Sequence, residues 1–579
     1  MINDLYTSLG ENLSGTPWTV YPRPQMRRES YVNLNGLWDF AVTHTAELPA
    51  HYDSRILVPF CPESLLSGLH REIAPGSYLY YRKALTLPEG FSKGRVLLHI
   101  GAADQVTRVY VNGAFAGGHT GGYNAFAVDI TDHLQQENEL VIAVFDDLRE
   151  KVLPYGKQSL TRGGMWYTPV SGIWQTVWLE SVPEEHIESL DIQVTGDTAT
   201  ITVTPALEGA VVLEGRRVPL ENGAAVVTPE EIHLWTPETP HLYDFAVETE
   251  SDRVESYFAL RTLEVKDFAG IPRLCLNGEP YFFHGLLDQG YWSDGIYTPA
   301  SPECYEKDIL EMKALGFNTL RKHIKVEPEQ FYYDCDRLGM VVFQDMVNNG
   351  DYSFFRDTLL PTVGLQKCRD THLHTDPATR EAFLRGMEET VAQLKNHPSV
   401  CCWTIFNEGW GQFCSDAAYD RLKELDSSRF IDATSGWFRR NKSDVNSRHI
   451  YYTPWSTLRP GEKPLILSEF GGYTYAEPKH LFNPDKAYGY KTCKTKEQFR
   501  AAMAELYVMK VLPAVERGLC AAICTQVSDV EDEINGMLTY DRKVNKADGE
   551  SMRQIASALQ ETFLRACGIA SCTDPSQAD

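Results

Sequence analysis

Eight short apolar runs, separated by amphipathic helix patterns, occupy the second half of this 579-residue chain and restrict its possible folds most strongly. The runs are 281–287, 317–323, 340–346, 400–407, 430–436, 449–455, 464–470 and 519–526. Helix patterns such as 302–315 and 377–396 lie between them. Buried parallel strands appear as continuous apolar segments, and crossover helices connect them. Eight such units in about 300 residues predict a TIM (β/α)8 barrel.

The residues before this region form short alternating patterns that are separated by Gly, Asn and Asp, with almost no helix signal. One example is the segment 108–113, RVYVNG, whose Asn-Gly is typical of a hairpin turn. The pattern predicts a β-sandwich over residues 1–184. A second set of short strands over residues 185–265 has the size of an immunoglobulin-like β-sandwich. Residues 266–579 then remain for the barrel.

Two of the predicted barrel strands end in a glutamate. The run 400–407 leads directly to Glu408, and the run 464–470 has Glu469 next to its end. Active sites of TIM barrels lie at the C-terminal ends of the strands, so both carboxyl groups are expected at the same rim. Glycoside hydrolysis is the chemistry that most often needs such a pair. The sequence therefore predicts a paired-carboxylate active site.

Charge and cysteine usage limit the expected partners and the expected compartment. The formal net charge of −25 argues against nucleic acid or an anionic membrane as a partner. The chain has no 18-residue apolar run, and residues 1–10 lack the basic and apolar regions of a signal peptide. Its 13 cysteines include no CxxC motif, which favours buried reduced thiols over disulfides or metal ligands. We expect a cytoplasmic protein with neither a metal site nor a cofactor.

Several motifs, in order along the chain, resemble those of glycoside hydrolase family 2, the group of β-galactosidases, β-glucuronidases and β-mannosidases. They are 21–25 (YPRPQ), 34–40 (LNGLWDF), 171–174 (SGIW), 234–243 (LWTPETPHLY), 396–400 (NHPSV) before Asn407-Glu408, and 468–472 (SEFGG). The resemblance implies that the first domain is a jelly-roll-like, sugar-binding β-sandwich and that the barrel is catalytic. It also implies small glycosides or oligosaccharides as substrates, and a possible homo-oligomer.

The resemblance assigns the general acid/base to Glu408 and the nucleophile to Glu469. A retaining enzyme holds these carboxyl groups about 5–5.5 Å apart, with one acid protonated and the other ionised. Asn407 is similar to the residue that hydrogen-bonds the sugar 2-OH in this family. These three residues imply a retaining exo-β-glycosidase that hydrolyses terminal β-linked sugars by double displacement, with β-galactosidase as the default subtype.

Three polar residues at the ends of the second and third strands complete the expected sugar site. In similar enzymes an arginine at the position of Arg321 orients the nucleophile. A nearby histidine contacts the sugar, so His323 either does the same or is an imidazole that is satisfied within the core. Asp345 either binds the sugar or holds Arg321 and His323.

Aromatic residues around the barrel mouth are further candidates. Tyr451, Tyr452 and Trp455 close the predicted sixth strand, and in similar enzymes a tyrosine there hydrogen-bonds the nucleophile. Strand alternation decides which of these side chains points inward, so the sequence leaves this choice open. Tyr452 and Trp455 are candidates for contact with the substrate. Trp410 is a candidate platform for stacking against a sugar.

Two positions differ from the family pattern within the sugar pocket. Trp166 stands about where similar enzymes extend an acid from the first domain, and we expect its side chain to reach the barrel mouth. Gln526 stands where the eighth strand usually presents a tryptophan, and is a possible polar substitute. The difference at Trp166 weakens a simple lactose-type assignment.

The uronate-binding motif of β-glucuronidases, Asn-any-Lys, is replaced by Glu533-Ile534-Asn535. The acidic run 531–533 would repel a carboxylate there. Lys322 or Lys325 could bind one from another direction, and an outward Lys325 would leave the neutral pocket that we expect. The alternatives are a β-glucuronidase or β-galacturonidase with a non-standard carboxylate clamp and, from a different class, a catalytically silent carbohydrate-binding protein.

Overall fold

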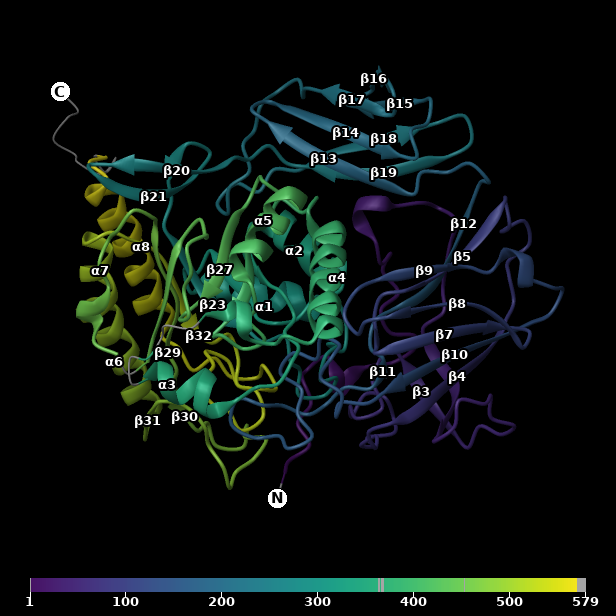
Figure 1. The fold of residues 1–579 in the computed structure, drawn as a ribbon, viewed down its shortest axis with the longest axis horizontal. Coiled ribbons are helices and arrows are strands. Elements are labelled where there is room, and N and C mark those ends of the chain that lie inside the picture. Colours follow the sequence, from purple (N-terminus) through teal and green to yellow (C-terminus); the bar gives the residue numbers. More distant parts are fainter. Residues whose placement is uncertain (1, 363–364, 366–368, 452, 570–579) are drawn as a thin grey trace.

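The computed structural model describes residues 2–362, 365, 369–451 and 453–569, which form two β-sandwiches and a TIM barrel. The first sandwich lies to one side of the barrel, and the second covers one end of it (Figure 1). Among the described helices, none combines the length and the apolar character that crossing a membrane would require.

The first sandwich contains a six-stranded sheet packed on a four-stranded one. In the order of the sheet, the six strands are β3 (Ser54–Val58), β2 (Gly36–Thr43), β4 (Ser77–Leu85), β10 (Asn138–Asp146), β7 (Val106–Val111) and β8 (Ala114–Thr120). The four strands are β1 (Tyr31–Asn33), β12 (Val177–Val182), β5 (Arg95–Ile100) and β9 (Phe126–Asp129), and a separate pair joins β6 (Ala103–Asp104) to β11 (Gly172–Ile173). Alternation in β2 buries Trp38 and Phe40 between the sheets, while Leu37 faces outward.

The second sandwich is smaller and pairs a three-stranded sheet with a four-stranded sheet. The first sheet holds β13 (Ser189–Thr195), β14 (Thr198–Thr204) and β17 (Ala224–Val227). The second sheet holds β16 (Arg216–Pro219), β15 (Ala210–Leu213), β18 (Tyr243–Glu248) and β19 (Arg253–Phe258). In β14 the residues Ala199, Ile201 and Val203 are buried, as strand periodicity requires. A small sheet of β20 (Leu263–Phe268), β21 (Ile271–Leu276) and β22 (Glu279–Pro280) then leads into the barrel.

The barrel strands form one parallel eight-stranded sheet. In chain order they are β23 (Phe283–Asp288), β24 (Thr319–Lys322), β25 (Val341–Asp345), β26 (Val400–Asn407), β27 (Phe430–Ser435), β28 (Asn446–Ile450), β29 (Leu465–Gly471) and β32 (Leu519–Thr525). The predicted sixth strand, 449–455, is wrong at both ends. Strand β28 begins three residues earlier than predicted because Asn446 already pairs with Leu465 of β29. The strand does not extend to 455, since Pro454 has no N–H to donate to a neighbouring strand.

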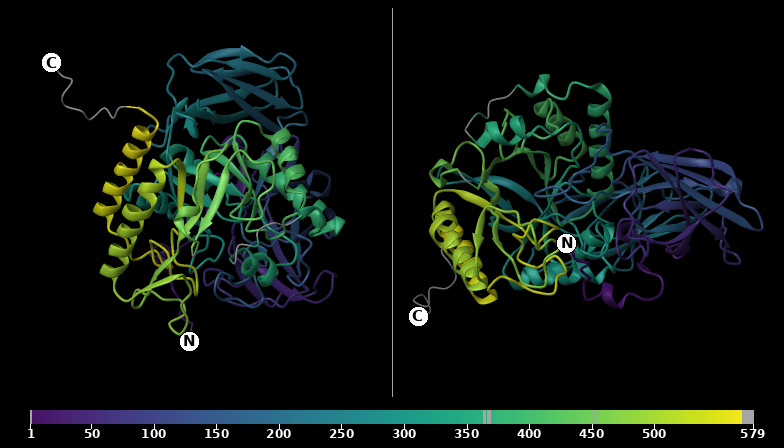
Figure 2. Two further views of the ribbon diagram at one scale, coloured as in Figure 1. Left: turned by 60° about the vertical axis from the view of Figure 1, so that its left-hand side comes forward. Right: turned by 90° about the horizontal axis from the view of Figure 1, so that it is seen from below.

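Helices surround this sheet (Figures 1 and 2). They are α1 (Glu303–Ala314), α2 (Glu329–Leu338), α3 (Leu360–Thr362), α4 (Pro377–Leu394), α5 (Ser415–Leu425), α6 (Lys496–Leu506), α7 (Leu512–Glu516) and α8 (Gly549–Ala566), with a minor strand pair β30 (Tyr473–Tyr475) and β31 (Lys491–Cys493) at the rim. Every residue of β26 is buried, which explains the continuous apolar run in its sequence. The chain leaves this strand through Glu408 and Gly409, which have φ angles of 53° and 76°.

The first sandwich shares a hydrophobic core with the barrel, and this core fixes its position. Trp174 and Tyr167 of the sandwich belong to the same buried cluster as the barrel strands. The hydroxyls of Tyr123 and Tyr297 lie 2.9 Å apart, and the Tyr155 N–H donates to the carbonyl of Asn348 at 3.0 Å. A large apolar interface of this kind holds two domains in one orientation. The loop between β10 and β11 is thereby held against the barrel.

Candidate active site

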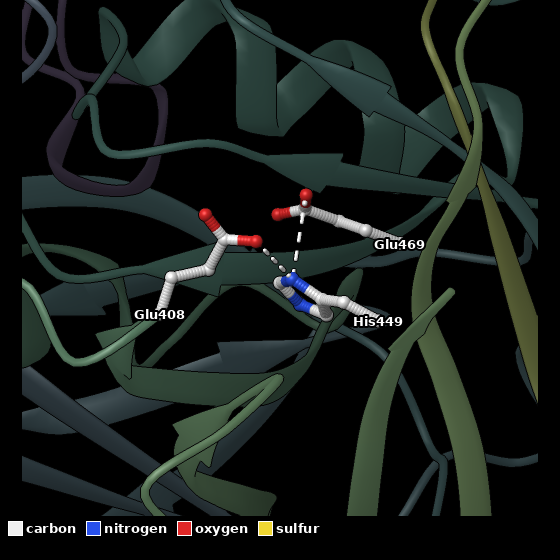
Figure 3. Close-up of side chains that lie close together, drawn as sticks. All are labelled: Glu408, His449 and Glu469. Carbon is white, nitrogen blue, oxygen red and sulfur yellow. Dashed lines mark hydrogen bonds and ion pairs between the residues drawn. The ribbon is translucent and has the colours of Figure 1, made fainter. Parts of the chain in front are cut away.

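Two carboxylates and an imidazole meet at the C-terminal rim of the barrel (Figure 3). Glu408 follows β26, His449 lies in β28 and Glu469 lies in β29. One carboxylate oxygen of each glutamate and one ring nitrogen of His449 lie within 4.8 Å of one another. The Glu469 side chain is 6% exposed and that of Glu408 is 22% exposed, so solvent reaches one acid more easily than the other.

Glu469 is held as an anion. Its Oε1 accepts a hydrogen bond from Arg321 Nη1 at 3.0 Å, and its Oε2 accepts one from the Tyr451 hydroxyl at 2.8 Å. Burial alone would raise the pKa of Glu469, but His449, Arg321, His323 and the Tyr451 hydrogen bond together lower it to about 2. The group is therefore ionised throughout the neutral range, as a nucleophile must be.

Arg321 connects four strand ends. Besides Glu469, it donates to Asp345 Oδ1 at 3.0 Å, to the Ser468 carbonyl at 3.1 Å and to Asn407 Oδ1 at 2.8 Å. Burial acts to lower the pKa of Arg321, but Asp345 and Glu469 outweigh it and raise the pKa above its ordinary value. The guanidinium stays charged and sets the orientation of three polar side chains at once.

His323 and Asp345 form a second buried pair behind this arginine. His323 Nδ1 lies 2.7 Å from Asp345 Oδ2, so the two oxygens of Asp345 serve His323 and Arg321 separately. Burial is the main reason that the pKa of His323 is lowered to about 4, and the imidazole is neutral at pH 7. Asp345 therefore contacts both Arg321 and His323, and its binding of a sugar stays a prediction.

His449 is the member of the cluster that the sequence interpretation missed. Its Nδ1 lies 2.7 Å from Glu408 Oε1, and its Nε2 lies 3.0 Å from Ser435 Oγ. Alternation along a strand places His449 and Tyr451 on the same side of it. This pattern could have identified His449 as a member of the cluster from the sequence. Because the predicted sixth strand covers 449–455, His449 stands at its start and not near its C-terminal end, where site residues are expected.

The aromatic candidates near the sixth strand have different positions. Tyr451 contacts the nucleophile candidate, while Tyr452 lies outside the described residues. Trp455 follows the strand and packs edge-on against Phe470, with ring centroids 5.9 Å apart. Because Phe470 adjoins Glu469 in β29, its side chain points to the opposite face of that strand. The structure therefore does not bring Trp455 into the carboxylate cluster.

A group of aromatic rings lines the rim beside Glu408. The ring centroid of Trp166, from the first sandwich, lies 4.9 Å from that of Trp410 and 5.0 Å from that of Tyr352. Burial is the main reason that the pKa of Tyr352 is raised; the charge of Glu408 adds to this change, while the hydrogen bond to Thr358 opposes it. The Trp437 indole donates to the Glu408 carbonyl at 3.0 Å. The first domain thus contributes a side chain to the wall of the site.

Polar side chains of the loop after β32 hydrogen-bond to one another and to the first sandwich. Gln526 is fully buried, and its Nε2 donates to Asn535 Oδ1 at 2.7 Å. Asn535 in turn donates to Glu533 at 2.9 Å, and the Tyr167 hydroxyl donates to the other oxygen of Glu533. Gln526 is therefore placed as a support for this loop, with its Oε1 as a buried acceptor that has no partner among the described residues.

Lys322 and Lys325, the two lysines that could bind a uronate, are both paired with carboxylates of the protein. Lys322 Nζ lies 2.6 Å from Asp288 and 2.8 Å from Glu327. Lys325 Nζ lies 2.9 Å from Glu327 and also donates to the carbonyls of Gly290 and Tyr297. Both side chains are 1% exposed, so their charges are compensated inside the protein.

Glu408, His449 and Glu469 also have the spacing of a set of metal ligands. Two carboxylates and an imidazole would suit a divalent transition metal. However, Arg321 already donates to Glu469 Oε1, and its positive charge would repel a second cation at the same carboxylate. The arrangement suits nucleophilic and acid–base chemistry better than metal binding.

Comparison with known proteins gives matches over most of the chain. The model for glycosyl hydrolases family 2, TIM barrel domain, matches residues 270–556, and the model for glycosyl hydrolases family 2 matches residues 184–261. A β-galactosidase of Thermoanaerobacter pseudethanolicus is 29% identical in an alignment of 435 positions that covers 68% of this chain and 54% of that protein. A putative β-glucuronidase of Formosa agariphila is 25% identical over 68% of this chain and 48% of its own length. The chain thus spans about half the length of these two relatives.

Other relatives align over more of their length. The β-glucuronidase of Felis catus is 25% identical over 80% of this chain and 82% of its own. Among solved structures, a β-D-glucuronidase of Dictyoglomus thermophilum has a TM-score of 0.70 at 20% identity, covering 94% of this chain and 98% of that one. A β-glucuronidase of Ruminococcus gnavus in complex with D-glucuronic acid has a TM-score of 0.70 at 18% identity, covering 93% and 100%. With the matched family models and the order of the domains, these findings show that the chain belongs to glycoside hydrolase family 2.

Proposed function

We propose that this protein is a retaining exo-β-glycosidase that hydrolyses terminal β-linked sugars by double displacement. The observation that carries the proposal is the separation of the two acids: an oxygen of Glu408 and an oxygen of Glu469 lie within 4.8 Å of each other. Retaining enzymes hold their carboxyl groups about 5–5.5 Å apart, whereas inverting enzymes need about 6.5–9.5 Å to admit a water molecule. An oxygen–oxygen separation within 4.8 Å is closer to the retaining arrangement than to the inverting one.

The contacts of each acid match one role in this mechanism. Glu469 is ionised and oriented by Arg321 and Tyr451, so it can attack the anomeric carbon and form a covalent glycosyl intermediate. Glu408 is more exposed and lies beside His449, where it can protonate the departing glycosidic oxygen. The resulting Glu408 carboxylate then takes a proton from water, which attacks the anomeric carbon and releases Glu469.

In this proposal, Asn407 has the role of binding the sugar next to the reacting carbon. Arg321 donates to its Oδ1 at 2.8 Å, which orients the side-chain amide so that Nδ2 points away from the arginine. An amide N–H at this position can donate to the sugar 2-OH, a contact that strengthens in the transition state. Arg321 thereby positions both the nucleophile and this donor.

The glycone is a β-linked uronic acid in the favoured form of this proposal. Relatives include both β-galactosidases and β-glucuronidases, while the solved structures of similar fold named above are β-glucuronidases. They support the alternative of a β-glucuronidase or β-galacturonidase better than the β-galactosidase default. The Asn-any-Lys motif is missing, so the carboxylate clamp must be non-standard.

The test is hydrolysis of a panel of 4-nitrophenyl β-glycosides: glucuronide, galacturonide, galactoside, glucoside, mannoside and fucoside. We expect turnover of at least one uronide, with the β-anomer as the first product seen by proton NMR. An α-anomer as the first product would contradict retention. If none of the panel were hydrolysed while sugars still bound, the protein would be a catalytically silent carbohydrate-binding protein.

A further inference from the structure

We infer that Lys157, on the loop between β10 and β11 of the first sandwich, binds the carboxylate of a uronic acid glycone. The inference rests on the proposed glycosidase function and names the residue that would select its substrate class. It assigns the carboxylate clamp to a different domain from the one that carries the two catalytic glutamates.

Three other cations near the pocket, Lys322, Lys325 and Arg162, are already paired. Lys322 and Lys325 share the buried carboxylates of Asp288 and Glu327. Arg162, on the same loop as Lys157, lies 3.5 Å from Glu531 and 3.7 Å from Asp532. Each of these charges is compensated within the protein, so none of them offers the uncompensated cation that a carboxylate ligand requires.

The main chain around Lys157 is fastened to the loop that follows β32. The Lys157 carbonyl accepts a hydrogen bond from the Tyr167 N–H at 3.0 Å. The Tyr167 hydroxyl donates to Glu533, which occupies the first position of the missing Asn-any-Lys motif. The next residue, Gln158, is buried and donates to Asp104 at 2.7 Å. The backbone of Lys157 is therefore held beside the place where similar enzymes bind a uronate.

The ammonium group of Lys157 is directed at the active site. Its Nζ lies 6.0 Å from the ring centroid of Trp166, which packs against Trp410 just after the acid Glu408. Burial is the main reason that the pKa of His323 is lowered, and the charge of Lys157 contributes to the same change. The ammonium group therefore lies on the Trp166 side of the site, near enough to His323 to affect its pKa.

Among the residues that the structure describes, Lys157 has no counterion. Within the described part of the chain, no carboxylate oxygen lies within ion-pair distance of its Nζ, and the side chain is half-buried. Burial raises the pKa of Glu533, although Tyr167 and Lys157 oppose this, and its oxygens already accept from Tyr167 and Asn535. A half-buried ammonium without a partner, at the rim of a sugar site, suits an anionic group on the ligand.

The expected selectivity follows from the strength of such a contact. A charge-assisted hydrogen bond to a carboxylate contributes enough to change binding by a factor of about 10–100, whereas a neutral hydroxymethyl group at the same carbon gains much less. Lys157 is thus expected to separate a glucuronide from a glucoside, and a galacturonide from a galactoside. The two glycones in each pair differ only at C6.

The experiment compares Lys157→Met, Lys157→Arg and wild type on these two pairs of 4-nitrophenyl β-glycosides. Lys93→Met, which removes an exposed lysine of the same sandwich, is the matched control for the change in charge. We expect Lys157→Met to lower kcat/KM by a factor of about 10–100 on the uronides and to leave the neutral glycosides within about twofold. Lys157→Arg should keep most of the uronide activity, and Lys93→Met should keep all of it.

Other outcomes separate this inference from the proposed function. Equal losses on charged and neutral glycosides would mean that Lys157 only supports the loop, and unchanged uronide activity would exclude any role for it. Wild-type turnover of neutral glycosides alone would overturn the inference and leave the glycosidase function standing. Calorimetric binding of D-glucuronate and of D-glucose gives a readout that does not depend on turnover: loss of the preference for glucuronate in Lys157→Met supports the inference, and no preference in wild type overturns it.

Discussion

Replacement of the nucleophile candidate, Glu469→Gln, should separate its chemical role from its contribution to stability. Glutamine has nearly the same shape and can still accept hydrogen bonds from Arg321 and Tyr451, but it cannot form a stable glycosyl ester. We expect kcat to fall by about four to six orders of magnitude, as when other enzymes lose their nucleophile. The fold should remain, because the side-chain volume is unchanged.

The contribution to stability can be worked out from the lowered pKa of Glu469. A pKa of about 2 in place of 4.5 corresponds to about 3 kcal/mol of stabilisation, at about 1.4 kcal/mol for each unit. Because the folded-state pKa lies below the unfolded-state value, this stabilisation is complete above about pH 4.5. It is lost as the pH falls through 2. Glu469→Gln should therefore be less stable than wild type by up to about 3 kcal/mol at pH 7, and by about half of that at pH 3.

Three measurements check this reasoning. Urea unfolding, followed by tryptophan fluorescence at pH 7 and at pH 3, gives the difference in stability, with the exposed Glu561→Gln as the control. Hydrolysis of an activated aryl glycoside gives the loss of activity. A 2-deoxy-2-fluoro glycoside should label wild type, and mass spectrometry should find the label on Glu469. A label on another acid, or a stability difference that does not change with pH, would refute the assignment.

Three further variants test the neighbouring groups. Glu408→Ala should reduce turnover of poor leaving groups far more than that of activated aryl glycosides, and azide should rescue it with formation of the β-azide; an α-azide would contradict retention. Tyr451→Phe removes a hydrogen bond that lowers the pKa of Glu469, so the acidic limb of the kcat/KM profile should move to higher pH. Trp166→Ala opens the wall beside Trp410 and should lower kcat/KM about tenfold or more without changing the thermal unfolding midpoint by more than a few degrees.

Much of the architecture could be predicted because it depends on local patterns. The continuous apolar run of β26 marks a strand buried on both faces, and alternation in β2 marks a strand with one buried face. Once eight parallel strands are recognised, their C-terminal ends must meet at one rim. Glu408 and Glu469 could therefore be placed together although many residues separate them in the chain.

The error at the sixth strand shows where local patterns stop being sufficient. Residues 446–449 (NSRH) are polar, while 450–452 (IYY) are apolar or aromatic, so hydrophobicity alone places the strand too late in the chain. Pairing with β29 selects Asn446–Ile450, and this choice decides that His449 and Tyr451 face the two carboxylates. Register depends on a partner strand, which the segment itself does not specify.

The sequence by itself determined the barrel, the order of the domains and the pair of acids, since periodicity and strand-end position are properties of single segments. Only the tertiary structure decided which charges remain available around them. Lys322 and Lys325 are compensated by Asp288 and Glu327, while Lys157 lies beside Trp166 on a loop of a different domain. The free energy of a charge depends on every group within a few ångströms, and folding brings those groups together from distant parts of the chain.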